Sequence, residues 1–353
     1  MVSAASQSTF SFFKKQQETG GNRSSLSFWT PAGTVSFNQK ALLSVCSVYK
    51  ITLVLEYARQ VGEGILQPEA CIPLDYVNRY YLPHIDSGHK SFLDNTTGDC
   101  SKLDSLVIGM IRYSSNAIAE YLTDMLSPEK VDLLVSSLGM EHSPTLYVCS
   151  SMLALNNTKD LPYDEYVQYL QTLTPDWVRQ QSFLIHAALK DKTMQIKDEF
   201  YLDPNIIDVH AEMLEKSTTE SYLKVMQKVA SETYFPPPIQ TVIYRLFDAV
   251  DMQSAFSKKL YVHSGAKGGS ANYPGMKNAA LAVAGFMQLK NSTDKPRTYS
   301  MVFNGLNPSE FAVRLQDMNN FITALSVSDY FIVEMVRRLQ AWWRWLNQTN
   351  EYK

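Results

Sequence analysis

The chain has 353 residues, of which 45% are hydrophobic and 12% are aromatic, and its formal net charge at pH 7 is −3. That length can supply a large hydrophobic core, in one large domain or in two interlocked subdomains. The near-neutral charge argues against a nucleic-acid-binding protein, which normally carries a basic excess. No apolar run approaches the roughly 18 residues of a membrane-spanning helix, so we expect neither a nucleic-acid partner nor a transmembrane segment.

The N-terminal residues and the cysteines leave the cellular compartment open. The first thirty residues show no charged segment followed by an apolar one, so the protein is either cytosolic or exported with its signal peptide already removed. The four cysteines lack a metal-binding spacing such as CxxC. Cys46 can pair with Cys149 or pack as a small buried residue, and Cys71 can form a disulfide with Cys100.

The N-terminal part of the chain predicts strands followed by a buried helix. Residues 9–38 contain two segments rich in aromatic and β-branched residues, TFSFFKKQ and SSLSFWTPAGTVSFN, with the turn signals ETGGN and PAG. From Ser47 to about Glu63 apolar residues occur on nearly all sides of a helix, which is typical of a central buried helix.

The middle of the chain predicts helices and the last third predicts strands. KLDSLVIGMIRYSSNAIAEYLTDML has a helical period interrupted at YSSN, which indicates two helices that meet at a polar turn. Further helices are predicted over 160–250, strands over 258–305, and a helical pattern from about Pro308 to Leu346. Strands therefore occur near both ends, and we expect them to pair in one sheet with the helical region inserted as a second lobe.

Three short motifs occur in order along the chain: SVYK at Ser47–Lys50, SSN at Ser114–Asn116, and KGG at Lys267–Gly269. This order resembles the serine β-lactamase and penicillin-binding protein superfamily, and class A β-lactamases most closely. That family carries S-x-x-K at the start of a buried helix, S-D-N at a helix–helix turn and K-T-G on a strand. The resemblance covers roughly residues 25–155 and 216–305.

The resemblance implies an α+β fold of the β-lactamase/transpeptidase kind, with an antiparallel sheet flanked by terminal helices and an inserted all-helical lobe. On this basis residues 1–46 and 255–353 form the sheet lobe, and residues 47–254 form the helical lobe. Residues 157–215 are longer than the equivalent segment of the family, and we expect them to form a helical insertion.

The chain departs from the family motifs at several positions. Ser115 stands where the family has Asp, and Gly268 stands where it has Thr or Ser. A competing alignment of HSG at His263–Gly265 would put His263 in the place of the third-motif lysine. We prefer Lys267, because KGGS leads into AALAVAGF much as the family motif leads into its next strand.

The segment that aligns with the omega-loop lacks the glutamate of the family. Class A enzymes carry E-x-x-L-N there, and this chain reads MLALN, so Leu155 and Asn156 match while Met152 takes the glutamate position. No carboxylate occurs between Glu141 and Asp160.

Residue chemistry predicts a nucleophile and its base. A serine hydroxyl needs a base within hydrogen-bonding distance, and helix positions three apart share a face, so Lys50 can contact Ser47. Burial and a second cation, Lys267, would lower the pKa of Lys50 and let it act as the base.

The family resemblance implies further roles. The backbone N–H groups of Ser47 and Ser270 would form the oxyanion hole, and Ser114 would pass a proton to the leaving atom. Asn116 would bind Lys50 and the substrate amide, and Lys267 the substrate carboxylate. The expected substrate-binding residues are Asn116, Asn156, Lys267, Gly269 and Ser270, with His263 as the alternative.

We therefore expect a serine hydrolase or acyltransferase that forms an acyl-enzyme on Ser47 without a metal or cofactor. Because Met152 cannot activate water, we expect weak β-lactamase activity, and a peptidase, esterase or acyltransferase acting on a small or peptidoglycan-like substrate fits better. One alternative is a non-catalytic relative that uses the cleft to bind ligands. Another is a hydrolase whose replacement base is Asp160, Asp164 or Glu165. The resemblance implies a periplasmic or secreted protein, and a cytoplasmic one stays open.

Overall fold

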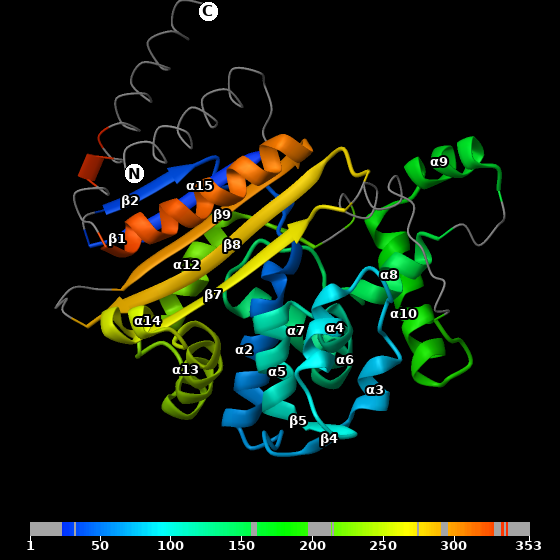
Figure 1. The fold of residues 1–353 in the computed structure, drawn as a ribbon, viewed down its shortest axis with the longest axis horizontal. Coiled ribbons are helices and arrows are strands. Elements are labelled where there is room, and N and C mark those ends of the chain that lie inside the picture. The colour runs from blue at the N-terminus through cyan, green and yellow to red at the C-terminus, as the bar shows by residue number, and fades with distance from the viewer. Residues whose placement is uncertain are drawn as a thin grey trace, which may run out of the picture.

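The five long strands form one sheet in the order β2-β1-β9-β8-β7, and every neighbouring pair is antiparallel (Figure 1). The strands are β1 (Ser24–Thr30), β2 (Gly33–Phe37), β7 (Tyr261–Ala271), β8 (Ala279–Leu289) and β9 (Arg297–Leu306). The computed structural model describes residues 23–31, 33–156, 161–196, 213, 215–273, 275–290, 296–327, 333–334 and 337.

Strand β8 shows why this sheet is covered on both faces. Its sequence, AALAVAGFMQL, is almost continuously apolar, and ten of its eleven residues are buried. Side chains alternate between the faces of a strand, so Ala282, Ala284 and Phe286 join one hydrophobic cluster while Leu281 and Val283 join another.

Two helices pack on opposite faces of the sheet. Helix α15 (Pro308–Val327) supplies Met318 and Phe321 to the cluster that contains Leu281, and Figure 1 shows it running along the sheet. Helix α12 (Thr219–Val229) supplies Tyr222 to the cluster on the other face.

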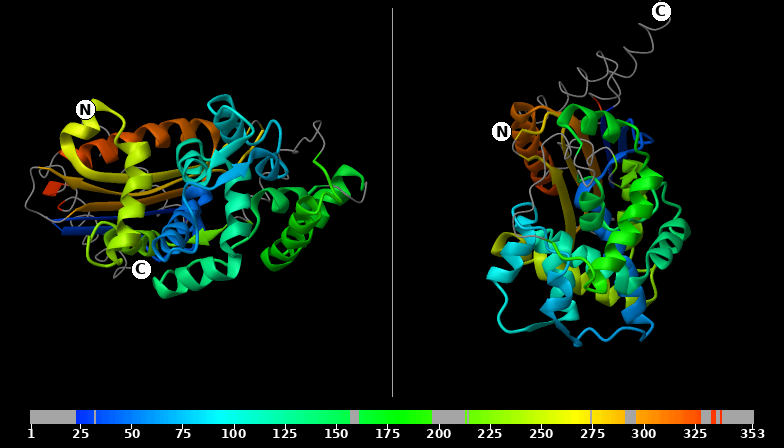
Figure 2. Two further views of the ribbon diagram at one scale, coloured as in Figure 1. Left: turned by 90° about the horizontal axis from the view of Figure 1, so that it is seen from below. Right: turned by 90° about the vertical axis from the view of Figure 1, so that its right-hand side faces the viewer.

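The central helix of the helical layer is α2 (Lys50–Gly62), which follows a one-turn 3₁₀ helix, η1 (Cys46–Tyr49). Around it lie α3 (Leu74–Asn78), α4 (Ser87–Asp94), α5 (Leu103–Tyr113), α6 (Asn116–Leu126), α7 (Pro128–Ser137), α8 (Val148–Ala154) and α13 (Pro237–Asp251). Helices α9 (Tyr163–Gln171) and α10 (Pro175–Lys190) lie at the end of the molecule away from β1 and β2 (Figures 1 and 2). Helix α14 (Ala255–Leu260) precedes β7.

Two small two-stranded sheets complete the fold. Strand β3 (Leu43–Ser44) pairs with β6 (Lys216–Ser217), directly before the turn that carries Ser47. Strand β4 (Cys71–Pro73) pairs with β5 (Cys100–Lys102), and the disulfide Cys71–Cys100 joins them. Cys46 and Cys149 are free and buried.

The α+β class, with an antiparallel sheet drawn from both terminal parts of the chain, is confirmed. The strand prediction for 258–260 is wrong, because these residues belong to α14. The predicted strand at residues 9–16, much of the 157–215 insertion and most of 328–346 lie outside the described residues. The lobe boundaries stay a prediction. None of the helices within the described ranges has the length and apolarity needed to cross a membrane.

Candidate active site

Ser47 lies on the 3₁₀ turn that leads into α2, with a half-buried side chain. Cys46, immediately before it, has a left-handed backbone with φ of 46°. A residue with a side chain adopts this conformation at a cost of about 1–3 kcal/mol, and such strain concentrates at functional sites. The strained turn places Ser47 at the N-terminal end of the central helix, where that helix meets the sheet.

Lys50 is fully buried and joins Ser47 to the turn between α5 and α6. Its Nζ donates to Ser47 Oγ at 3.1 Å, to Asn116 Oδ1 at 2.7 Å and to the carbonyl oxygen of Ser114 at 2.5 Å. Ser47 and Lys50 therefore make the direct contact that their spacing predicts.

Burial lowers the pKa of Lys50 to about 8, against the opposing effect of nearby anions, of which Asp86 is the strongest. The pKa of Lys267 lies well below its usual range, first because the side chain is buried and second because Lys50 is a nearby cation. Burial thus disfavours the charged form of both lysines, and the Lys50 cation further disfavours that of Lys267, so a neutral amine is accessible near neutral pH.

The YSSN segment forms the predicted turn between two helices. Ser114 ends α5 in a left-handed conformation with φ of 62°. Ser115 begins α6, and its Oγ accepts the backbone N–H of Ile118 at 3.1 Å, as an N-cap serine does. Ser115 thus has a structural role at the position where the family motif has Asp.

A carboxylate does reach this turn, from Asp86 at the start of α4. Its Oδ2 accepts the backbone N–H groups of Asn116 and Ala117, each at 2.8 Å, and its Oδ1 accepts that of His89 at 2.9 Å. The side chain is buried and lies at the N-terminus of α6, where a negative charge is stabilised. Sequence analysis missed Asp86. In the sequence it is visible only as an N-cap of α4, because its contact with α6 spans thirty residues.

His89 connects the same turn to α3 through two hydrogen bonds. Its Nδ1 lies 2.9 Å from Ser115 Oγ, and its Nε2 lies 2.9 Å from Asn78 Oδ1. Burial lowers the pKa of His89 to about 4, so this histidine is a neutral structural group at physiological pH.

The edge strand β7 brings Lys267 to the site. Lys267 Nζ donates to Ser114 Oγ at 2.9 Å and to the carbonyl oxygen of Gly268 at 2.5 Å. His263 lies elsewhere on β7, where its Nδ1 is 2.6 Å from Asp248 Oδ2 and its ring stacks on Tyr244 at 4.0 Å. Of the two alternative residues, the structure places Lys267 beside Ser114.

Gly269 allows β7 to approach the Ser47 turn. A Cβ atom on Gly269 would lie 2.5 Å from the backbone nitrogen of Ser47, closer than any side chain tolerates. At Gly268 an added Cβ would meet no atom within 4 Å. Gly269 is therefore required by close packing, whereas Gly268 leaves open space at the edge of the sheet.

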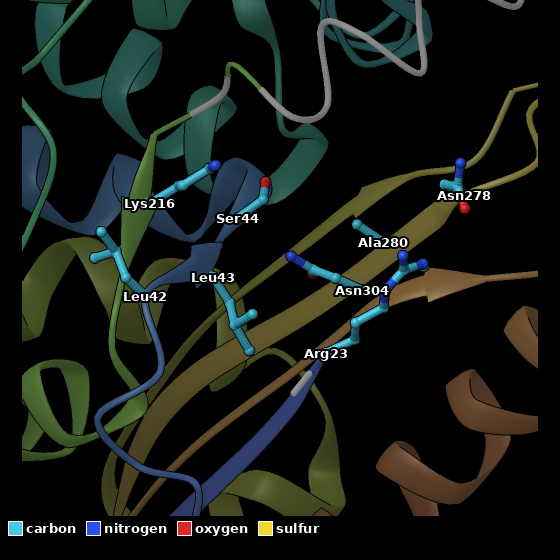
Figure 3. Close-up of a pocket in the computed structure, with 9 residues that line it drawn as sticks. Arg23, Leu42, Leu43, Ser44, Lys216, Asn278, Ala280 and Asn304 are labelled. Atoms are coloured by element: carbon cyan, nitrogen blue, oxygen red, sulfur yellow. The ribbon is translucent and has the colours of Figure 1, made fainter. Parts of the chain in front are cut away.

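A cavity of about 710 Å³ lies at this junction. The candidate residues that line it are Ser47, Ser114, Asn116, Gly269 and Ser270. A second cavity, of about 190 Å³, lies beyond Ser44 and is lined by residues such as Arg23, Lys216 and Asn304 (Figure 3). The candidate residues gather around the larger cavity.

The remaining candidates lie apart from this cluster. Met152 is buried in α8, and neither it nor the half-buried Asn156 is among the described residues that line the large cavity. Asp164 and Glu165 are exposed on α9, and Asp160 lies outside the described residues.

The helix that carries Met152 is held by a buried carboxylate of α6. Glu120 accepts the backbone N–H groups of Cys149 and Ser150, and its other oxygen lies 3.1 Å from His186 Nδ1 of α10. Glu120 thereby fixes the start of α8 and connects it to α10.

Asp86→Asn tests the structural account of the turn. The amide retains one acceptor oxygen for the three N–H groups, so we expect the free energy of unfolding to fall by about 1–3 kcal/mol. Asp94→Asn is the matched control, since it removes an exposed carboxylate of α4 that pairs only with Lys90 among the described residues, and exposed pairs contribute about 0–1 kcal/mol. Urea denaturation measures both, and equal losses would contradict the account.

The sequence profile described as "Beta-lactamase enzyme family" matches residues 14–260 of this chain. No curated protein matches it. The chain is similar to the solved structure of a beta-lactamase from Chitinophaga pinensis DSM 2588, with a TM-score of 0.55 and 13% identity over 90% of this chain and 99% of that one.

Two other solved structures are similar at comparable levels. A representative of class A beta-lactamase from Bacteroides cellulosilyticus DSM 14838 has a TM-score of 0.53 and 15% identity, over 87% of this chain and 92% of that one. A beta lactamase from Xanthomonas campestris pv. campestris str. ATCC 33913 has a TM-score of 0.55 and 10% identity, over 91% and 97%. These similarities show a shared fold, and the profile match covers more than half of the chain. The chain therefore belongs to the beta-lactamase enzyme family.

Proposed function

We propose that this protein is a serine hydrolase or acyltransferase that forms an acyl-enzyme on Ser47 with Lys50 as the general base. The observation that carries the proposal is the buried contact between Lys50 Nζ and Ser47 Oγ at 3.1 Å. A burial-lowered pKa of about 8 makes roughly one tenth of the Lys50 side chains neutral at pH 7, against about one in 3,000 for an ordinary lysine.

The hydrogen-bond partners of Lys50 are compatible with a neutral amine whose lone pair points toward the Ser47 hydroxyl. A neutral amine has two N–H donors and one lone pair. The carbonyl oxygen of Ser114 and Oδ1 of Asn116 can only accept hydrogen bonds, so they take the two N–H groups. The nearer of the two hydroxyls around Nζ is that of Ser47, at 3.1 Å against 3.4 Å for Ser114 Oγ. The lone pair is then left for the proton of Ser47.

Ser114 is positioned to transfer that proton to the leaving atom. Lys267 Nζ donates an N–H group to Ser114 Oγ at 2.9 Å. Because the hydroxyl oxygen accepts this hydrogen bond, the hydrogen of Ser114 remains available to the cleft.

In the proposed acylation one proton passes from Ser47 to Lys50 and then through Ser114 to the leaving atom. The Ser47 O–H bond breaks and its proton goes to Lys50 as Oγ bonds to the carbonyl carbon. The backbone N–H groups of Ser47 and Ser270 bind the oxygen that becomes negative. The bond to the leaving atom then breaks as that atom takes a proton through Ser114, and the acyl group stays on Ser47.

Deacylation is proposed to be the slow step. A positioned general base typically accelerates such a step by about 10²–10⁴, and Met152 cannot provide one. We therefore propose a weak β-lactamase that acts mainly on another small or peptidoglycan-like acyl substrate. The Cys71–Cys100 disulfide supports a periplasmic or secreted location, because disulfides persist in oxidising compartments.

Intact-mass spectrometry after incubation with benzylpenicillin tests the nucleophile. We expect the mass to rise by one penicillin, because ring opening leaves the whole molecule attached to Ser47, and Ser47→Ala to abolish the rise. Ser87→Ala is the matched control, since Ser87 lines the same cavity, and we expect it to keep the adduct. An unmodified but folded wild-type protein, with penicillin left intact, would instead favour a cleft that binds ligands without covalent chemistry.

The rate of adduct formation is expected to rise with pH through a midpoint near 8. Lys50 loses its proton around that pH, so the fraction of neutral base grows about tenfold between pH 6 and 7 and levels off above 9. Intact-mass measurements on samples quenched at set times, from pH 6 to 10, give the profile. Circular dichroism is the control for folding. A flat profile over this range would exclude Lys50 as the base.

Met152→Glu tests the missing deacylation base. We expect its penicillin adduct to decay at least about tenfold faster than that of the wild type, because the omega-loop alignment puts the water-activating glutamate of the family at this position. Met152→Gln has nearly the same size without the charge and should leave the decay unchanged. If the two variants decay at the same rate, the omega-loop alignment does not identify the position of the base.

A further inference from the structure

The large cavity extends past the Ser47 cluster, across the edge strand β7, to the space between the sheet and α15. The residues that line its far part come from β8, β9 and α15, and include Leu281, Val283, Tyr299, Phe311, Leu315 and Ile322. The site at Ser47 and an apolar groove at α15 therefore belong to one continuous cavity.

The alternation of side chains along β7 explains this continuity. Lys267 and Gly269 are buried toward the helical layer, whereas Ala266, Gly268 and Ser270 alternate with them on the opposite face, and all of these except Lys267 line the cavity. The lining residues of β7 are small, and at Gly268 an added Cβ would meet nothing within 4 Å. The strand thus presents little side-chain bulk between the two parts of the cavity.

The wall formed by α15 is mainly apolar, with Asn319 as its polar residue, and it is accessible. Phe311, Leu315, Met318 and Ile322 have the spacing of one helix face, and all four line the cavity. Leu315 is 38% exposed although it is a large hydrophobic residue. The apolar face of α15 therefore extends beyond the part that packs on the sheet.

The charges around the cavity favour an uncharged ligand at this end. Among the described residues that line it, the single charged side chain is that of Asp86. Its oxygens bind backbone N–H groups at the opposite end, beside Asn116. A charged group between β8 and α15 would lose its hydration without gaining an oppositely charged partner among the described lining residues, whereas a hydrocarbon chain would bury apolar surface there.

We propose that the substrate carries a hydrocarbon chain on its leaving group, and that this chain binds between β7 and α15 while the acyl carbon lies at Ser47. The inference rests on the proposed function, because it assigns the substrate class of the same site. The chain belongs to the leaving group because the passage begins at Gly268, next to Lys267. Lys267 contacts Ser114, the residue that returns the proton to the leaving atom. A volume of about 710 Å³ lies within the range of about 300–1,000 Å³ typical of small-molecule sites.

The proposal is tested by measuring the single-turnover release of alcohol from the acetate esters of butanol, hexanol and octanol. Each ester is used below its solubility limit. Each buried methylene group is expected to raise the second-order rate constant for acylation by up to about fourfold. The ethyl esters of the matching longer acids should show no such rise. Acylation that is independent of alcohol length, or that rises with acid length instead, would overturn the assignment.

Leu315→Arg places a charge in the groove wall and should remove most of the dependence of the acylation rate on alcohol length. Val313→Arg is the matched control, because Val313 is 47% exposed on the same helix and is not among the lining residues. It should behave as the wild type. Equal behaviour of the two variants would overturn the placement of the chain beside α15.

Binding to Ser47→Ala separates this inference from the proposed chemistry, since it requires no acylation. We expect calorimetry to give at least tenfold tighter binding of octanol than of butanol, with the preference lost when Leu315→Arg is added. If no ester reacts but this binding pattern holds, the proposed function fails and the groove assignment stands. If esters react but octanol has no preference, the groove assignment fails and the function stands.

Discussion

The site depends on one buried amine, that of Lys50. A cation without water is costly unless a carboxylate neutralises it, and this chain surrounds it instead with neutral oxygens of Ser47, Ser114 and Asn116. The anion that acts on it most strongly, Asp86, is hydrogen-bonded to backbone N–H groups at the start of α6. Neutral partners stabilise the charged form too little to offset burial, so the pKa falls to about 8. The fold therefore gives up some stability to hold a lysine that can lose its proton near neutral pH.

Local features of the site were predictable from the sequence because they depend on helix geometry. Ser47 and Lys50 are three residues apart at the start of one helix, and the polar interruption YSSN in an apolar period indicated a turn. Local composition likewise predicted strands near both ends of the chain, at SSLSFWT and AALAVAGFMQL. What these features share is that each is set by residues close together in the chain.

Features that depend on distant segments were not predictable in this way. Asp86 supports the Asn116 turn across thirty residues, and nothing in IDSGHK indicates which helix it will reach. Lys267 and His263 are both plausible on a glycine-rich strand, and only the position of β7 against Ser114 distinguishes them. The continuity of the cavity with α15 depends on the order of strands in the sheet, which no local pattern specifies.

The close packing at Gly269 makes the geometry of the site sensitive to the position of β7. The close approach of Gly269 to the backbone of Ser47 means that the sheet and the central helix touch through main-chain atoms, with no flexible side chain between them to absorb an error. The strand that makes this contact is the outermost of its sheet, and among the described strands it is hydrogen-bonded to β8 alone. A shift of one residue along β8 would turn Lys267 and Gly269 to the opposite face. The alignment of the nucleophile is therefore tied to a strand that is hydrogen-bonded within the sheet on one side.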